Sequence, residues 1–101
     1  ELSYGRQRQL ELALTVARDP LLIMLDEPTA GLSSEETRRA VPFIKQIVEG
    51  KTLVVVEHDM DVVFNLADRI TVLNDGRVLA TGSPDEIRNN DDVRNAYLGR
   101  R

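Results

Sequence analysis

The sequence has 101 residues, of which 42% are apolar and 30% are charged, a balance typical of a folded domain or a piece of one rather than a disordered chain. Its 13 basic and 17 acidic side chains give a net charge of −4, so no basic field is available to attract nucleic acid or anionic lipid. The absence of cysteine excludes disulfides and thiolate metal sites.

The first predicted element is a helix over residues 3–18. Ser3 is the expected N-cap, and Pro20 ends the pattern. Four apolar residues follow the i, i+3, i+4, i+7 spacing of a buried helical stripe. They are Leu10, Ala13, Leu14 and Ala17. The run Ser3-Tyr4-Gly5 at the helix start is either an anion site, because free amide donors meet there, or an ordinary capped helix.

Two short apolar runs, at residues 21–27 and 52–58, are predicted to be neighbouring parallel strands. Neither run alternates with polar residues, which is typical of strands covered on both faces. The helix between them is predicted to begin with a capping box, Ser33 with Glu36, and to end at Gly50. A strand, a helix and a strand in this order predict a parallel crossover. The residues expected in the core are Leu10, Leu14, Leu22, Val55 and Val63.

The last third of the sequence is predicted to form a hairpin and a helical tail. Asp59 caps a short helix, and Asp75-Gly76 favours a tight hairpin turn. Ser83 with Glu86 makes a second capping box, and Gly99 is the expected end of the final helix. The whole sequence is therefore interpreted as one α/β unit.

Acidic side chains and the only histidine follow the two predicted strands. Because ligands bind beyond the carboxyl ends of parallel strands, we expect Asp26, Glu27, Glu57 and His58 to project toward one edge. Adjacent carboxylates suit Mg²⁺, which combines one or two protein oxygens with waters and substrate phosphates. The second carboxylate can orient or deprotonate a water, and the histidine can donate to a phosphate oxygen. A solvated turn and a packing histidine are the alternative interpretation.

A phosphate-binding loop of the pattern G-x-x-x-x-G-K-[ST] does not occur in these residues. Gly50-Lys51-Thr52 matches the end of that pattern, but Lys45 stands where its first glycine belongs. The predicted order is also reversed, since a helix precedes this segment and a strand follows it. The sequence begins at Glu1 rather than at a methionine, and we expect this to be the edge of a fragment.

In their order and spacing, these motifs resemble the ATP-binding cassette (ABC) family, specifically the C-terminal half of its nucleotide-binding domain. Leu2–Arg6 resembles the signature motif, Leu21–Glu27 the Walker B strand, Ala30–Ser33 the D-loop and His58 the switch histidine. The tail from Thr81 onward is most similar to ATPase subunits of branched-chain amino acid importers. The implied fold is the C-terminal part of a P-loop NTPase domain, with a parallel strand-helix-strand core, a hairpin and a helical tail.

The resemblance implies a partial ABC ATPase domain over residues 1–101, with its N-terminal P-loop half missing. Its parts would be a signature helix at 3–18, a Walker B strand at 21–27, a switch-histidine strand at 52–58, and a C-terminal hairpin and helices at 69–99.

The resemblance also implies a role for each motif residue. Asp26 would hold Mg²⁺ through water, Glu27 would act on the attacking water, and His58 would contact the γ-phosphate of ATP. Two such domains close head to tail in the family. The residues expected to serve the partner subunit's ATP are Ser3, Tyr4 and Gly5, and those expected at the D-loop dimer seam are Gly31, Leu32 and Ser33.

The function implied is an ATP-hydrolysing, energy-coupling subunit of an importer, peripheral on the cytoplasmic face of the membrane. Its partners would be a second ATPase subunit and transmembrane permease subunits, with no nucleic acid. The 101 residues alone are expected to be inactive. The alternatives are an ABC-type ATPase of DNA repair or chromosome maintenance, and a non-catalytic α/β interaction module.

Overall fold

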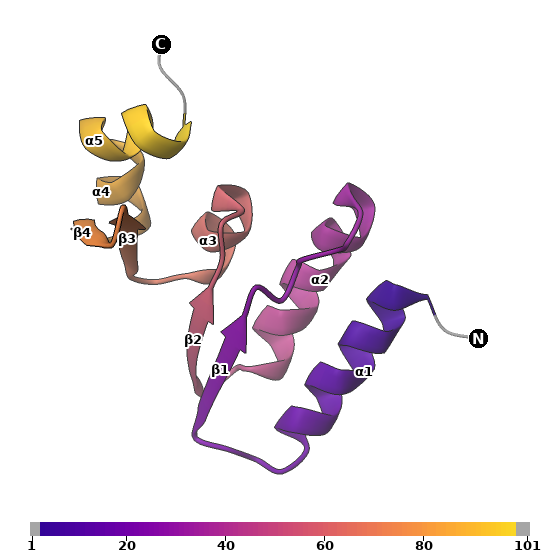
Figure 1. Cartoon of the computed structure of the whole chain (residues 1–101). Coiled ribbons are helices and arrows are strands. Elements are labelled where there is room, and N and C mark those ends of the chain that lie inside the picture. Colours follow the sequence, from indigo (N-terminus) through magenta and orange to yellow (C-terminus); the bar gives the residue numbers. More distant parts are fainter. Residues whose placement is uncertain (1–2, 99–101) are drawn as a thin grey trace. The chain divides into compact units, whose positions relative to one another are not determined.

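The computed structural model describes residues 3–98 and divides into two compact units, one ending at His58 and the next beginning at Asp59 (Figure 1). The sequence pattern, interpreted as one α/β unit, does not indicate this division. Each unit has its own two-stranded sheet, and no strand of one sheet is hydrogen-bonded to a strand of the other among the described residues. The predicted motif residue Leu2 and the predicted helix end at Gly99 lie outside the described residues.

The first unit is a helix followed by a strand-helix-strand crossover. Its elements are α1 (Tyr4–Val16), β1 (Leu22–Asp26), α2 (Ser34–Ile47) and β2 (Thr52–Val56). The strands pair in parallel with Leu22 opposite Thr52 and Asp26 opposite Val56, so both strands end at the same edge, as predicted. Both helices lie on one side of the strand pair (Figure 1).

The middle of α2 and one face of the strands form the buried part of this unit. Ile23 of β1 and Ala40 and Ile44 of α2 are buried. Ser33 caps α2: its hydroxyl accepts from the Glu36 amide at 3.1 Å, and its own amide donates to Glu36 Oε1 at 3.0 Å. This reciprocal capping box, predicted from the sequence, satisfies two amides that a helix start leaves free.

The predicted buried stripe of α1 is wrong. Leu10 is half exposed and Leu14 is 62% exposed, and none of the helix's described residues is buried. Apolar residues occur around most of this helix, so their spacing does not select a single face. Leu12 and Val16, one turn apart, are half buried instead, and Leu12 lies between α1 and α2. Packing against α2 decided which face of α1 turned inward.

The prediction that both faces of the strands are covered is also wrong. Side chains alternate between the faces of a strand. Ile23 is buried on the face toward the helices, whereas Leu22 is half exposed and Met24 is 72% exposed on the other. On β2 the exposed face carries Val54 and Val56. No helix of the first unit covers this second face, and Leu22 is therefore not a core residue of that unit.

The second unit forms its own core. Its elements are α3 (Met60–Leu66), β3 (Ile70–Asn74), β4 (Arg77–Gly82), α4 (Pro84–Arg88), α5 (Asp91–Val93) and a π-helical turn (Arg94–Leu98). The antiparallel strands meet at Asp75-Gly76, both with positive φ, which confirms the predicted tight turn. The buried cluster is Ile70, Val72, Ile87 and Val93. No helix in the described part of the chain is long and apolar enough to cross a membrane.

Candidate functional site

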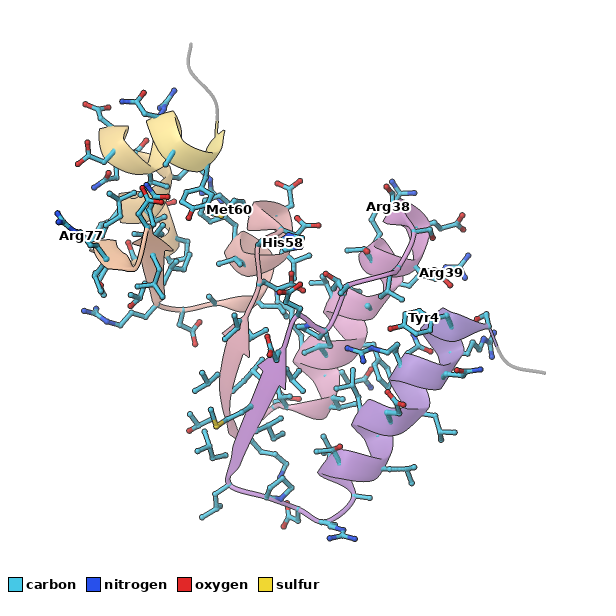
Figure 2. The ribbon with its side chains drawn as sticks, in the orientation of Figure 1. Tyr4, Arg38, Arg39, His58, Met60 and Arg77 are labelled. Carbon is cyan, nitrogen blue, oxygen red and sulfur yellow. The ribbon has the colours of Figure 1, made fainter. Side chains whose placement is uncertain are left out.

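The structure brings Glu27 and His58 together at the carboxyl end of the parallel strands. The amide of Glu27 donates to the carbonyl of Val56 at 2.7 Å, which extends the strand pairing by one residue. Glu27 Oε1 then lies 3.5 Å from His58 Nε2, and both side chains reach solvent, being 47% and 75% exposed. Figure 2 shows His58 where β2 ends. A carboxylate and an imidazole held this close can position a water and donate to an anion.

Asp26 is the last residue of β1 and is exposed beside Glu27. The described residues contain no group of three or more side chains that could hold a metal ion. Asp26 and Glu27 would thus supply only part of a coordination shell. That arrangement fits Mg²⁺, which keeps several waters and binds through one or two carboxylates together with substrate phosphates.

The loop that follows Glu27 is held by two side chains from outside it. Glu57 Oε2 accepts from the Thr29 amide at 3.0 Å and from the Thr29 hydroxyl at 2.6 Å. Arg8 of α1 donates through Nη2 to the carbonyl of Pro28 at 3.2 Å. Thr29 is only 7% exposed, so its amide and hydroxyl depend on Glu57 as their acceptor. These contacts fix the backbone immediately after Glu27.

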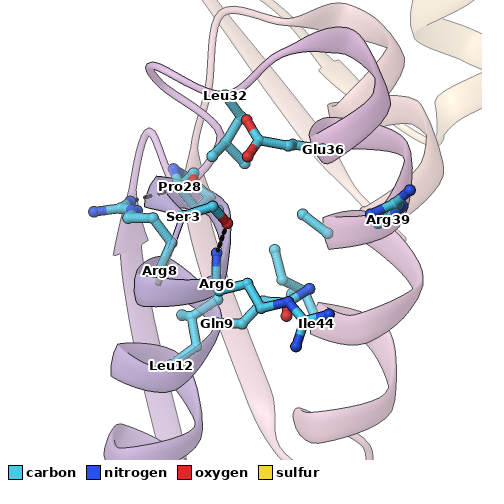
Figure 3. Close-up of a pocket in the computed structure, with 12 residues that line it drawn as sticks. Ser3, Arg6, Arg8, Gln9, Leu12, Pro28, Leu32, Glu36, Arg39 and Ile44 are labelled. Atoms are coloured by element: carbon cyan, nitrogen blue, oxygen red, sulfur yellow. Dashed lines mark hydrogen bonds between the residues drawn. The ribbon is translucent and has the colours of Figure 1, made fainter. Parts of the chain in front are cut away.

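The start of α1 meets the start of α2 through Gly5 and Glu36. Ser3 caps α1, with its hydroxyl accepting from the Arg6 amide at 3.2 Å (Figure 3). A Cβ on Gly5 would lie 2.7 Å from Glu36 Oε2, so a side chain there would displace the Glu36 carboxylate. The hydrogen bond from the Ser33 backbone amide lowers the pKa of Glu36. The Ser33 hydroxyl and the Gly5 backbone lower this pKa further. One carboxylate therefore joins the two predicted motifs.

Tyr4 and Gly31 make a second contact between the same two motifs. Gly31 has φ +81°, and a Cβ there would lie 3.1 Å from the Tyr4 ring. Figure 2 shows Tyr4 at the first turn of α1. The guanidinium of Arg8 lies 6.0 Å from the centre of the same ring. Glycine at position 31 thus permits both the left-handed backbone and the close approach of the aromatic ring.

A pocket of about 330 Å³ lies between α1 and α2 (Figure 3). Leu32 lines it on the side of the loop, and Ala40 and Ile44 line it on the side of α2. Ser33 is not among the residues that line it, and its side chain forms the capping box of α2. The predicted residues therefore fall into two groups. Asp26, Glu27 and His58 end the strands, whereas Ser3, Tyr4, Gly5, Gly31, Leu32 and Ser33 gather at the starts of the two helices.

Sequence reasoning missed the residues that hold these groups in place. Thr29 and Arg8 carry no motif spacing that indicates a contact with Glu57 or Pro28, since those pairs are formed by the tertiary fold. Glu36 was expected only as a capping residue. The strand pattern places Glu57 at this edge, but nothing in the pattern indicates Thr29, 28 positions away, as its partner.

Comparison with known proteins places this geometry in a family. The chain is 47% identical over 100 residues to the high-affinity branched-chain amino acid transport ATP-binding protein LivG of Salmonella typhimurium, and 44% identical to BraF of Pseudomonas aeruginosa. The solved ADP conformation of MJ1267, an ATP-binding cassette of an ABC transporter, superimposes with a TM-score of 0.80 at 26% identity over 99% of this chain. The chain belongs to the ATP-binding cassette ATPase family. A family model described as a branched-chain amino acid ATP-binding cassette transporter matches residues 77–101 of this ABC chain.

The match covers nearly all of this ABC chain but only part of each relative. The alignments with LivG and BraF span 97% of this chain and 39% of the relative, and MJ1267 is covered to 41%. The fold is thus α/β and corresponds to part of an ABC-type P-loop NTPase cassette.

Proposed function

We propose that this chain supplies the C-terminal part of the ATP-hydrolysing, energy-coupling subunit of an importer for branched-chain amino acids. Two relatives that align with almost the whole chain, LivG and BraF, are named as ATP-binding proteins of branched-chain amino acid transport. The observation that carries the catalytic part of the proposal is the 3.5 Å approach of Glu27 and His58 at the ends of paired parallel strands.

In this proposal the strand-end residues act on the reacting phosphate. Glu27 orients the attacking water and accepts its proton, because its carboxylate is exposed at the edge where a ligand binds. His58 donates to an oxygen of the γ-phosphate. Asp26 would hold Mg²⁺ through a water, and the ion supplies neutralisation of phosphate charge when it is bound.

The residues at the helix starts serve a different ATP in this proposal. Ser3, Tyr4 and Gly5 face the nucleotide held by a second ATPase subunit, where the positive end of the α1 helix dipole favours an anion. The D-loop residues, which lie at the same dimer seam, are Gly31, Leu32 and Ser33. The contacts of Tyr4 with Gly31 and of Gly5 with Glu36 support a shared surface for both motifs.

The proposed assembly contains two ATPase subunits and transmembrane permease subunits, with the ATPase peripheral on the cytoplasmic face of the membrane. Nucleic acid has no place in it, since the net charge is −4. These 101 residues contain no phosphate-binding loop, so hydrolysis requires a segment that supplies one. We propose that the 101 residues alone neither bind nor hydrolyse ATP.

The test is Glu27→Gln in the full-length protein reconstituted with its permease. We expect turnover to fall by about 100-fold or more, because general-base catalysis contributes roughly that much. ATP binding should stay within about twofold, since the amide keeps the size of the side chain and the phosphate contacts are made elsewhere. Asp61→Asn, an exposed acid at the start of α3, is the matched control and should leave turnover unchanged. Turnover near wild type in the Glu27 variant would show that another group is the base.

A further inference from the structure

The backbone at Glu27 is strained. Its φ is +48°, a left-handed backbone conformation that residues other than glycine rarely adopt. The next residue is Pro28, which further disfavours helical conformations of the residue before it. Such a conformation persists only where the surrounding structure holds it. The structure must therefore contain contacts that hold this turn.

Glu57 makes the contacts that meet this need. One carboxylate oxygen, Oε2, accepts from both the amide and the hydroxyl of Thr29, at 3.0 and 2.6 Å. The other oxygen, Oε1, accepts from the amide of His58 at 3.2 Å. The same side chain thus touches the turn that carries Glu27 and the backbone of His58.

Burial makes the Thr29 contact costly to break. Thr29 is 7% exposed and Glu57 is half buried. A buried hydroxyl or amide that loses its partner destabilises its conformation, because nothing then replaces the hydrogen bond that it made to water in the unfolded chain. Because hydrogen bonds to an ionised acceptor are roughly twice as strong as neutral ones, a carboxylate holds two donors better than an amide would.

We propose that Glu57 is a positioning residue for the hydrolysis proposed above: by holding Thr29 and the His58 backbone, it fixes the separation of Glu27 and His58. Glu57 does not touch the reacting atoms and acts through the two residues that do. The inference rests on the proposed function, and it adds a residue to which the motifs assign no role. Its measurable consequence is on turnover rather than on ATP binding.

The test uses three variants of the full-length protein. Thr29→Val keeps the shape of the side chain and removes the hydroxyl, Thr29→Ser keeps the hydroxyl and removes a methyl group, and Glu57→Gln removes the charge. A misplacement of about 1 Å can cost up to roughly 100-fold in rate, so we expect kcat to fall about tenfold in Thr29→Val and Glu57→Gln. KM for ATP should change by less than about twofold, since the binding contacts are untouched. Thr29→Ser should retain most of kcat.

The control is Thr15→Val, which removes a hydroxyl that donates only to the Glu11 carbonyl within the exposed face of α1. It should leave kcat and KM unchanged. A merely structural role for Glu57 would lower the melting temperature of Thr29→Val and Thr29→Ser alike without the selective loss of kcat, and would overturn the inference. Normal kcat in Thr29→Val, alongside inactivity of Glu27→Gln, would refute the role of Glu57 and leave the proposed function intact. An inactive wild-type protein would refute both.

Discussion

Leu14 and Ile44 allow a direct test of which helical residues are buried. The helical spacing predicts that Leu14 is core, yet Leu14 is 62% exposed, whereas Ile44 of α2 is fully buried at 0%. Truncating each residue to alanine removes the same number of carbon atoms. A comparison of Ile44→Ala with Leu14→Ala therefore isolates burial from side-chain chemistry.

The magnitude follows from the area and the cavity. At roughly 0.8 kcal/mol per buried methylene, truncating Ile44 costs about 2.4 kcal/mol in transfer alone. The cavity left between α2 and the strands raises this to about 3–4 kcal/mol, within the usual range for Ile→Ala in a core. Truncating Leu14 loses only the buried share of its side chain, little more than a third of the transfer free energy, or about 1 kcal/mol. It leaves no cavity, because the side chain is open to solvent.

The assay is urea unfolding of the 101-residue chain followed by far-ultraviolet circular dichroism, since the sequence contains no tryptophan. The two variants should differ in free energy of unfolding by about 2 kcal/mol or more, with similar dependence on urea. Equal losses in the two variants would show that the α1 stripe is buried after all. That result would refute the packing of α1 through Leu12.

Three further expectations concern acid, the hairpin and nucleotide. Backbone amides of Ser33 and Ser83 lower the pKa of Glu36 and Glu86 from the unfolded value of 4.5. The stability that these carboxylates contribute is therefore complete above pH 4.5 and is lost as the pH falls through their lower pKa values in the folded protein. Glu86→Gln should flatten the dependence of the free energy of unfolding on acid pH in urea titrations, and an unchanged dependence would contradict this expectation. Gly76→Ala places a side chain at φ +74° and should lower the melting temperature by about 4 °C, which corresponds to roughly 1 kcal/mol. An unchanged melting temperature would show that the turn relaxes to accept the side chain. The isolated 101 residues should show no ATP-dependent protection from hydrogen exchange and no phosphate release, and measurable turnover would refute the need for a separate phosphate-binding segment.

Local sequence patterns predicted most elements well because their causes are local. Ser33 and Glu36 form a capping box since both partners lie within one helical turn, and Asp75-Gly76 forms a tight turn because those residues tolerate positive φ. The meeting of Glu27 and His58 also followed from local information. Two parallel strands joined by a crossover end at the same edge, and each residue comes directly after a strand.

Patterns that required knowledge of a neighbour were predicted wrongly. The apolar stripe of α1 had more than one possible inner face, and the non-alternating strands suggested two covering layers where the described residues provide one. The division into two units was missed for the same reason, because nothing local tells whether a hairpin joins an existing sheet or pairs only with itself.

The sequence by itself determined the helices, strands, turns and caps, the order of the motifs, and the edge at which Asp26, Glu27 and His58 emerge. The tertiary structure decided which faces are buried, that Gly5 meets Glu36, and that Glu57 holds the strained turn after Glu27. The physical reason is the separation along the sequence of the residues that interact. Capping and turn preferences act between residues a few positions apart, whereas Glu57 and Thr29 are 28 positions apart and meet only because two strands pair.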